Sequence, residues 1–206
     1  MISYNDIDIQ NIIISAIWLF WATSNIGAGK PEDCGNYYAW GETAPKASYT
    51  WDNYFDTKNG GETFSIYRYV QSTKPTAVPT LRTMHDAAYS ATGGEGRMPT
   101  MEEWNELFEK CSRSYTTING SYCIKFKGPN GNVLYLPWNG AYDAGTLVGK
   151  GTQYCYWSSV LDRFTTSNKN ALMFTSMSKS SQPKYYGAGV RAVKDISNQS
   201  RQRFIS

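Results

Sequence analysis

Histidine is almost missing from this sequence, which contains a single one, His85, among 206 residues. A metal site built from several histidines is therefore excluded, and a His-containing catalytic triad would have to use this one side chain. An excess of charge of one sign is also missing, since 20 Lys and Arg residues against 17 Asp and Glu residues leave a net charge of +3. A nucleic-acid-binding protein usually carries a concentrated basic face, so we expect no nucleic-acid partner.

Hydrophobic runs long enough to cross a membrane are missing as well. The apolar segment at residues 12–22 has eleven residues, which is too few to span a bilayer. The residues before it carry Asp6 and Asp8 and no positive charge, unlike a signal peptide. Its β-branched and aromatic residues favour a buried strand. We therefore expect a protein that is not an integral membrane protein, with no signal peptide visible in this chain.

Cysteine pairs of the Cys-x-x-Cys kind are missing, although the chain has four cysteines: Cys34, Cys111, Cys123 and Cys155. A structural zinc site normally uses such pairs, so none is predicted. Cys111 and Cys123 could close a local loop, but spacing alone does not show that two cysteines meet. We interpret all four as small buried apolar residues.

Aromatic residues, in contrast, are abundant: 16 Tyr, 8 Phe and 7 Trp make up 15% of the chain. Tyr and Trp combine rigid contact area with a polar group, which suits a recognition surface. An aromatic-rich core explains the same count equally well. The excess therefore supports two interpretations, a binding surface and a core.

The clearest helix signal covers residues 101–111. Thr100 is an N-cap residue and Glu103 stands three residues later, which together form a capping box, and Pro99 ends any preceding helix. Four apolar residues share one face at helical spacing and are predicted to enter the core: Trp104, Leu107, Phe108 and Cys111. A second, short helix is predicted over residues 83–90.

The second half of the chain has the pattern of short strands. Residues 124–127 alternate apolar and charged side chains, residues 129–132 have turn chemistry, and residues 133–136 are apolar, which predicts a hairpin. Further strands are predicted at residues 153–159, around Leu172 and Phe174, and at residues 190–193. Helices followed by short antiparallel strands predict an α+β fold.

An ordered series of short motifs gives a more specific indication. The motifs are residues 21–28 (Trp-Ala-Thr-Ser-Asn-Ile-Gly-Ala), residues 35–43 (Gly-Asn-Tyr-Tyr-Ala-Trp-Gly-Glu-Thr), Asp86-Ala87-Ala88, Arg97-Met98-Pro99-Thr100 with Glu103-Trp104, Tyr156-Trp157-Ser158-Ser159, Tyr186-Gly187 and Val190-Arg191-Ala192-Val193. The series resembles the Fibrobacter succinogenes major paralogous domain, which is common in surface proteins of gut Bacteroidetes. That domain looks like a C-type lectin-like fold, related to the formylglycine-generating enzyme.

The resemblance implies an architecture for the whole chain. It implies one C-type lectin-like domain over residues 1–195, followed by a flexible tail at residues 196–206. Two helices would pack on small twisted antiparallel sheets with long irregular loops between the strands. The termini would be adjacent, with a strand at residues 17–22 beside residues 190–193, and a long C-terminal loop region would present the ligand surface.

Calcium-dependent lectins of this fold hold the metal with Glu-Pro-Asn or Gln-Pro-Asp and Trp-Asn-Asp motifs. The nearest strings here are Gln182-Pro183-Lys184 and Trp138-Asn139-Gly140, and both lack the acid. Calcium requires oxygen ligands that carry negative charge, whereas Lys184 would place a cation in the site. We therefore predict calcium-independent function with no metal and no cofactor.

Enzymatic motifs are also missing. The formylglycine-generating relatives use two cysteines close in sequence, whereas the nearest pair here, Cys111 and Cys123, is twelve residues apart. No Gly-x-Ser-x-Gly motif, phosphate loop or paired-carboxylate pattern is present. Glu102 and Glu103 are explained by the start of a helix, where negative charge is favoured. We predict that the protein is not an enzyme and has no catalytic residues.

A binding surface is the remaining interpretation. Residues 160–186 intersperse Ser, Thr and Asn with larger side chains, a mixture typical of antibody-like binding loops. The alternative is an ordinary solvated loop and hairpin edge. The predicted ligand-binding residues are Trp138, Asn139, Leu161, Asp162, Arg163, Phe164, Thr165, Lys184, Tyr185 and Tyr186.

The predicted function is a non-catalytic ligand-recognition module, an adhesin-like domain that binds an unknown protein or glycan. Some relatives of this fold are the variable proteins of diversity-generating retroelements, which diversify this same C-terminal region. The alternatives are an enzyme of the formylglycine-generating, sulfatase-modifying type and a fimbrial or structural surface subunit. The expected location is extracellular, on a cell surface or a phage particle.

Overall fold

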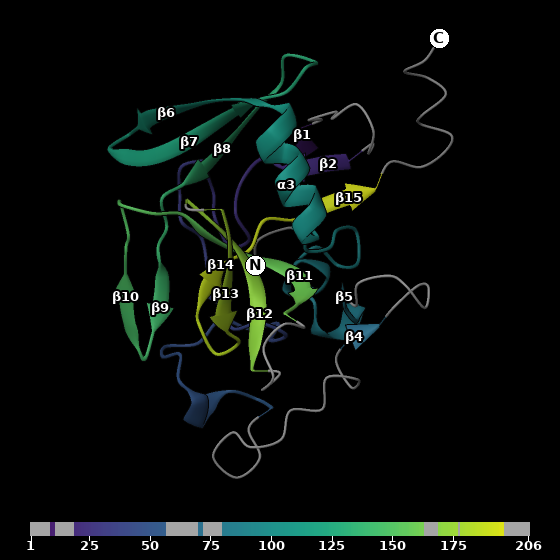
Figure 1. Ribbon diagram of the computed structural model, residues 1–206, viewed down its shortest axis with the longest axis vertical. Helices are drawn as coiled ribbons and strands as arrows, with labels where there is room; N and C mark the ends of the chain where they lie inside the picture. The colour runs from purple at the N-terminus through teal and green to yellow at the C-terminus, as the bar shows by residue number, and fades with distance from the viewer. Residues whose placement is uncertain are drawn as a thin grey trace.

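The computed structural model of the protein describes residues 9–10, 19–56, 70–71, 80–162, 169–176 and 178–195. Within these residues the fold is mixed α+β, with mostly short strands in curled sheets and two α-helices (Figure 1). The α+β prediction is therefore confirmed. None of the helices in this part of the chain has the length and apolar character needed to cross a membrane.

A strand near the start of the chain lies beside the last described strand. The strands β1 (Ile9–Gln10), β2 (Leu19–Ala22) and β15 (Val193–Asp195) form a three-stranded sheet in which β2 is central. Strands β2 and β15 are antiparallel, with Trp21 opposite Val193. The predicted pairing of these two ends of the chain is confirmed, although the last strand begins at Val193 and not at residue 190.

A seven-stranded sheet forms the centre of the molecule. Five strands lie in the order β13 (Ser178–Pro183), β12 (Asn170–Thr175), β11 (Cys155–Leu161), β14 (Ala188–Gly189) and β3 (Tyr37–Tyr38), and β5 (Thr80–Leu81) pairs with both β11 and β4 (Val70–Gln71). All seven residues of β11 are buried. The side chains of β11 therefore enter two apolar clusters, one on each face, which include Trp157 and Tyr156 respectively.

The helix α3 (Met101–Lys110) covers one face of this sheet. The predicted capping box is confirmed: the backbone N–H of Glu103 donates to the Thr100 hydroxyl (3.2 Å), and the Glu103 carboxylate accepts from the Thr100 N–H (2.8 Å). The side chains of Trp104 and Leu107 are buried as predicted, Phe108 is half-buried, and Cys111 ends the helix.

We expect Thr100→Ala to lower the free energy of unfolding by about 1 kcal/mol, because an alanine cannot accept the first-turn N–H. Urea denaturation monitored by circular dichroism measures this change. Thr146→Ala, at an exposed position of the strand β10, is the matched control and should change stability by less than about 0.5 kcal/mol. Equal losses in the two variants would contradict the capping role.

The helix predicted over residues 83–90 is divided in two. A 3-10 turn, η2 (Thr83–His85), is followed by α2 (Ala87–Ala91), and Asp86 between them has an extended backbone. The Asp86 carboxylate accepts from the N–H groups of Ala88 (2.8 Å) and Tyr89 (3.0 Å) and from Met98 (2.8 Å). An N-cap residue cannot be helical itself, so Asp86 ends one segment and starts the next.

A third sheet contains the predicted hairpin. Strands β7 (Ser121–Lys127) and β8 (Val133–Pro137) are joined by a turn in which Gly128 and Asn132 are hydrogen-bonded, and β6 (Ser112–Ile118) pairs with the other edge of β7. The strand β6 has no counterpart in the sequence predictions. Its residues are mostly exposed, so it lacks the apolar alternation that identifies a half-buried strand.

The register of this sheet excludes a bond between Cys111 and Cys123. Cys123 lies opposite Thr116, five residues beyond Cys111, which is about 16 Å along an extended strand. A disulfide needs Cα atoms within about 7 Å. All four cysteines are free; Cys111, Cys123 and Cys155 are buried as predicted, whereas Cys34 is only half-buried.

The remaining described elements are the 3-10 turn η1 (Trp51–Asn53) and the hairpin of β9 (Ala141–Asp143) with β10 (Thr146–Val148). This hairpin stands beside β12 and β13 in Figure 1. The predicted tail at residues 196–206 lies outside the described residues.

Candidate functional site

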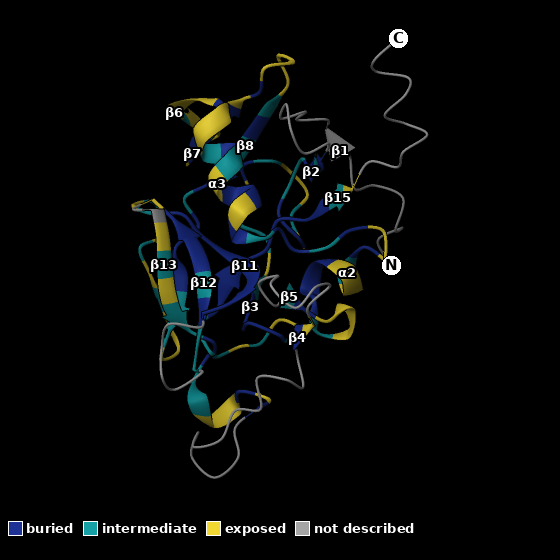
Figure 2. Cartoon of the chain, turned by 45° about the vertical axis from the view of Figure 1, so that its right-hand side comes forward, coloured by how far each residue is buried: buried dark blue, intermediate teal, exposed yellow. Residues whose placement is uncertain are grey.

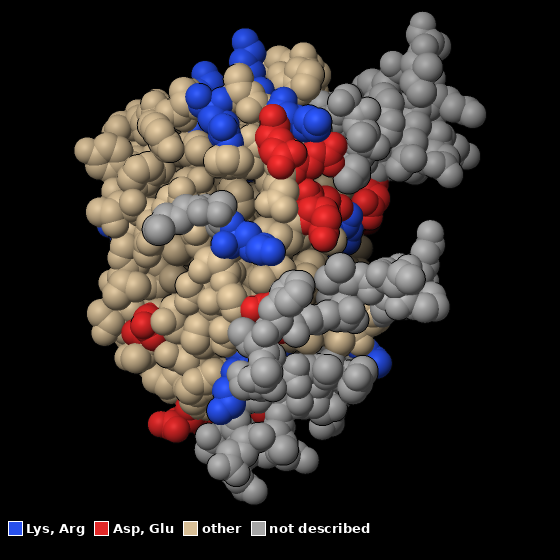
Figure 3. All heavy atoms as spheres, in the orientation of Figure 1, with Lys and Arg blue, Asp and Glu red and all other residues tan. Residues whose placement is uncertain are grey.

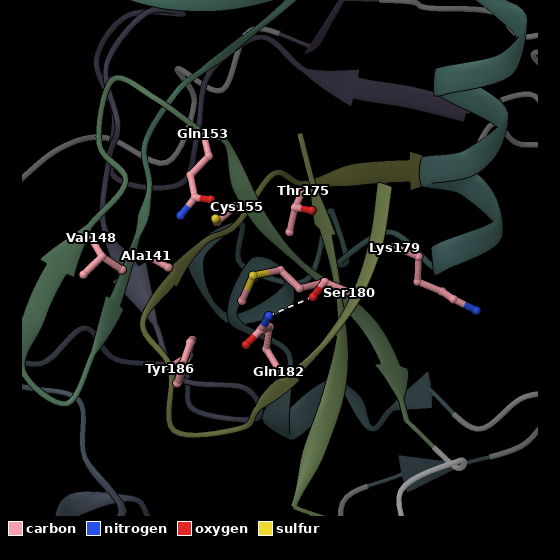
Figure 4. Close-up of a pocket in the computed structure, with 10 residues that line it drawn as sticks. Ala141, Val148, Gln153, Cys155, Thr175, Lys179, Ser180, Gln182 and Tyr186 are labelled. Atoms are coloured by element: carbon pink, nitrogen blue, oxygen red, sulfur yellow. Dashed lines mark hydrogen bonds between the residues drawn. The ribbon is translucent and has the colours of Figure 1, made fainter. Parts of the chain in front are cut away.

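A pocket of about 300 Å³ lies between the β9–β10 hairpin and the edge of the central sheet (Figure 4). It is lined by Ala141, Val148, Gln153, Cys155, Met173, Thr175, Lys179, Ser180, Gln182 and Tyr186. Its size is at the lower limit of small-molecule sites, which measure about 300–1,000 Å³.

The floor and one wall of the pocket follow from strand register. Cys155 of β11 lies opposite Thr175 of β12, and Met173 of β12 lies opposite Ser180 of β13. Gln182 follows two residues after Ser180 on β13. Because side chains alternate between the two faces of a sheet, these five residues share one face. The buried residues among them, Cys155, Met173 and Thr175, form the floor, and half-buried Ser180 and Gln182 form the wall.

The opposite wall depends on two glycines with left-handed backbone. Gly140 has φ +63°, and a Cβ there would lie 2.2 Å from the carbonyl oxygen of Val148. Gly149 has φ +71°, and a Cβ there would lie 2.2 Å from the Gln153 amide nitrogen. Only glycine permits these close approaches without strain, so Gly149 leaves the space that the Gln153 side chain occupies.

Asn139 fixes this wall to the central sheet. Its side-chain amide donates to the carbonyl of Cys155 (2.9 Å) and accepts from the N–H of Cys155 (2.8 Å). The Tyr37 hydroxyl donates to the Asn139 carbonyl (2.6 Å). Since Asn139 is fully buried, its role in the described structure is to connect the two sides of the pocket.

Two tyrosines and a carboxylate stand at the remaining side. The segment that carries Tyr186 is bonded to β9 through Tyr142 and Gly187, whose N–H and C=O groups bond reciprocally (2.7 and 3.0 Å). The Tyr185 hydroxyl donates to Asp143 (2.8 Å). Burial, followed by the contact with Asp143, raises the pKa of Tyr185 to about 12 and raises that of Tyr186 further. Both phenols therefore stay protonated at neutral pH.

Apart from Lys179, the polar residues that line the pocket are neutral. The Gln182 amide donates to the Ser180 hydroxyl (2.8 Å), while the Gln153 side chain lies on the other side of the pocket in Figure 4. The Lys179 side chain points away from the other labelled residues, and no Asp or Glu is among the described lining residues. Burial raises the pKa of the Cys155 thiol to about 12, so this thiol is not a thiolate nucleophile at neutral pH.

The surface around the pocket has few charges. On the face shown in Figure 3, Lys, Arg, Asp and Glu gather toward the upper part, while the region over β9, β10, β12 and β13 is largely uncharged. Within the described ranges, no three His, Cys, Asp or Glu side chains group as a metal site would require. The arrangement suits an uncharged polar ligand that exchanges hydrogen bonds with amides and hydroxyls.

The predicted site residues separate into several environments. Tyr186 lines the pocket. The half-buried Tyr185 ring contacts the Tyr186 ring, with centroids 5.1 Å apart. Tyr185 also packs 4.8 Å from Trp51, in a cluster of aromatic residues. Trp138 is half-buried on a different surface, formed by β6 and β7. Arg163, Phe164 and Thr165 lie outside the described residues.

Four predicted contact residues are buried, which corrects the expectation that they face a ligand: Asn139, described above, and Leu161, Asp162 and Lys184. Leu161 belongs to the apolar core, and Asp162 and Lys184 are almost inaccessible to solvent. Lys184 lies 5.2 Å from the centre of the Trp40 ring, and burial lowers its pKa to about 8. These side chains cannot contact a ligand without local opening of the fold, because β11 continues to Leu161, two residues beyond the predicted strand, and residues 178–183 form β13, where a loop was expected.

The pocket also contains residues that the sequence predictions did not select, above all Gln153, Ser180 and Gln182. A two-residue alternation in residues 178–183 could have indicated a strand. The segment is entirely polar except for Pro183, however, so it has the composition of a loop.

Comparisons of this chain with protein-family models, with curated proteins and with solved structures find no match.

Proposed function

We propose that the protein is a non-catalytic recognition domain that binds an uncharged polar ligand, such as one sugar unit of a glycan, in the pocket beside Tyr186. The observation that carries the proposal is the chemistry of the lining: two glutamine amides, the hydroxyls of Thr175 and Ser180, and a tyrosine around a floor that also contains Cys155 and Met173. Amides both donate and accept, as a neutral polyhydroxylated ligand requires.

The supports of the pocket are rigid, as a binding site needs. Its floor lies on β12 and on the fully buried strand β11, and its walls are held by the Asn139 side chain and by the bridge between Tyr142 and Gly187. A site that is already formed loses little entropy when the ligand binds. The pocket is therefore suited to selecting a ligand by shape and hydrogen bonds.

We also propose that the chain has the C-type lectin-like fold of the Fibrobacter succinogenes major paralogous domain. The motifs of that resemblance, though far apart in sequence, contact one another. The Arg191 guanidinium donates to Asn25 (3.0 Å), the Trp40 ring N–H to the carbonyl of Ser158 (2.9 Å), and the Trp104 ring N–H to that of Trp157 (3.3 Å). Such contacts support the proposal that these motifs form the framework of one fold.

The display of this domain on a cell surface or phage particle, and diversification of its C-terminal region, belong to the same proposal. They are tested by the genes that adjoin this one. A reverse transcriptase gene and a template repeat matching residues 138–186 would support a diversified binding protein, and their absence would remove that part of the proposal.

Binding is tested on a glycan array in excess chelator, because no metal is proposed. For a glycan that the protein captures, Gln153→Ala and Gln182→Ala should each weaken affinity about 3–10-fold, the usual value of one hydrogen bond. Isothermal titration measures the change. Gln71→Ala, at an exposed position of β4, is the matched control and should leave affinity unchanged. Unchanged affinity in both pocket variants would place the site elsewhere.

A further inference from the structure

The strand β6 forms one edge of its sheet. Its seven residues pair with β7 in continuous register, from Ser112 opposite Lys127 to Ile118 opposite Ser121. None of the described strands pairs with its other edge, and Figure 2 shows β6 on the outside of the molecule with mostly exposed residues. The outer edge of such a strand presents backbone N–H and C=O groups that can pair with another strand.

The usual protections of an edge strand are missing from β6. Natural edges carry lysines, prolines or bulges that prevent pairing with another chain. The strand has no proline and no irregularity in its register. Its single charged residue, Arg113, lies 3.5 Å from the Phe108 ring centre and donates to the Phe108 carbonyl (2.8 Å). Because this guanidinium is held against α3, its charge does not prevent another strand from pairing with the edge of β6.

A row of aromatic side chains crosses the same sheet and ends at β6. Tyr115, Tyr122 and Trp138 come from β6, β7 and the residue after β8, on the face that also carries buried Ile124. Tyr115 is 72% exposed and Tyr122 58% exposed. Trp138 contacts both rings, with centroids 5.7 Å and 6.0 Å away, and its ring N–H has no hydrogen-bond partner among the described residues.

We propose that β6 pairs antiparallel with β6 of a second copy of this chain, about a two-fold axis at Tyr115. The two three-stranded sheets would become one six-stranded sheet. Tyr115 would face its symmetry mate, so that the aromatic row continues from one copy into the other. Aromatic pairs directly opposite each other stabilise antiparallel strands.

The sequence of β6 suits this symmetric register. With Tyr115 on the axis, Ser114 lies opposite Thr116, Arg113 opposite Thr117, and Ser112 opposite Ile118. No residue with a charge faces its own copy, and the pair next to the axis, Ser114 with Thr116, is a Ser–Thr pair, which is favourable across strands. An unrelated extended peptide would satisfy the same backbone groups but would not place an aromatic ring beside Tyr115, so we assign the edge to a second copy.

Disulfide trapping tests the axis directly. In this register the Cα atoms of the two Tyr115 residues are about 4.5–5.5 Å apart, within the range of a disulfide. Mild oxidation of Tyr115→Cys should therefore give a covalent dimer. Thr117→Cys is the matched control, because the two copies of residue 117 would be about 13 Å apart. The unsubstituted protein, with its own four cysteines, gives the background.

Mass measurement in solution tests the association without a cross-link. Sedimentation equilibrium should show that the protein is a dimer. The double variant Ser114→Glu/Thr116→Glu should weaken the dimer affinity at least tenfold, because it places like charges opposite each other. The double variant Ser114→Lys/Thr116→Glu should keep the dimer, because it places opposite charges there. Circular dichroism verifies that each variant is folded. A protein that is monomeric at submillimolar concentration would overturn the proposal. A dimer whose affinity is the same in both double variants, or a disulfide that forms equally well with Thr117→Cys, would also overturn it.

Discussion

Trp104→Ala should lower the free energy of unfolding by about 3–5 kcal/mol, the usual cost of removing a fully buried large aromatic side chain. The Trp104 ring stacks on Phe174 (centroids 4.7 Å apart, planes 4° apart) and contacts Trp21 at 4.7 Å. It therefore connects α3, the central sheet and the sheet that joins the two ends of the chain. Its loss leaves a cavity that three rigid elements cannot fill.

Urea denaturation of Trp104→Ala and of Asn105→Ala measures this effect. Asn105 is the next residue of the same helix and is exposed, so its replacement should change stability by less than about 0.5 kcal/mol. A native domain is typically stable by only about 5–15 kcal/mol, so the Trp104 variant is expected to unfold at a much lower urea concentration. Similar midpoints for the two variants would mean that the helix faces the core differently.

Arg191→Ala should have a comparable effect for a different reason. Arg191 is completely buried and donates to Asn25 (3.0 Å), to the carbonyl of Ala22 (2.9 Å) and to that of Tyr135 (2.8 Å). All three acceptors are neutral, and burial lowers the pKa of the guanidinium to about 10. Each acceptor left unsatisfied costs about 1–3 kcal/mol, partly offset by the desolvation cost that the arginine itself no longer incurs, so we expect a loss of about 3–5 kcal/mol.

Arg113→Ala is the control for Arg191→Ala. Arg113 is exposed and packs on one aromatic ring, so its replacement should cost about 1 kcal/mol or less. The free energies of unfolding should be measured at low protein concentration, where association does not contribute. If Arg191→Ala is as stable as Arg113→Ala, the buried guanidinium does not hold β2, β8 and the Val190–Val193 segment together.

Local chemistry allowed several parts of the fold to be predicted. The capping box of Thr100 and Glu103 fixed the start of α3, because both partners lie within one turn of the chain. The hairpin of β7 and β8 followed from apolar alternation on either side of a turn. The pairing of β2 with β15 could not follow from such local signals and was predicted only through the family resemblance.

Edge strands and buried polar residues were not predicted correctly. The strands β6 and β13 are polar because one side of each is exposed, so neither has the apolar pattern of a strand. Asp162 and Lys184 are polar residues that the fold buries, and composition assigns such residues to the surface. For the same reason half of the predicted site residues were placed in a loop at residues 161–165, while Gln153 and Gln182 were not selected; Tyr186, which was selected, does line the pocket.

Nuclear magnetic resonance of the glutamine side-chain amides tests the pocket most directly. When a glycan captured on the array is titrated into the protein, the side-chain signals of Gln153 and Gln182 should shift with the occupancy of the site, and the Tyr186 ring should show contacts to ligand protons. The signal of Gln71 should not move. Shifts confined to the aromatic residues around Trp51 or Trp138, with Gln153 and Gln182 unchanged, would contradict a binding site in this pocket.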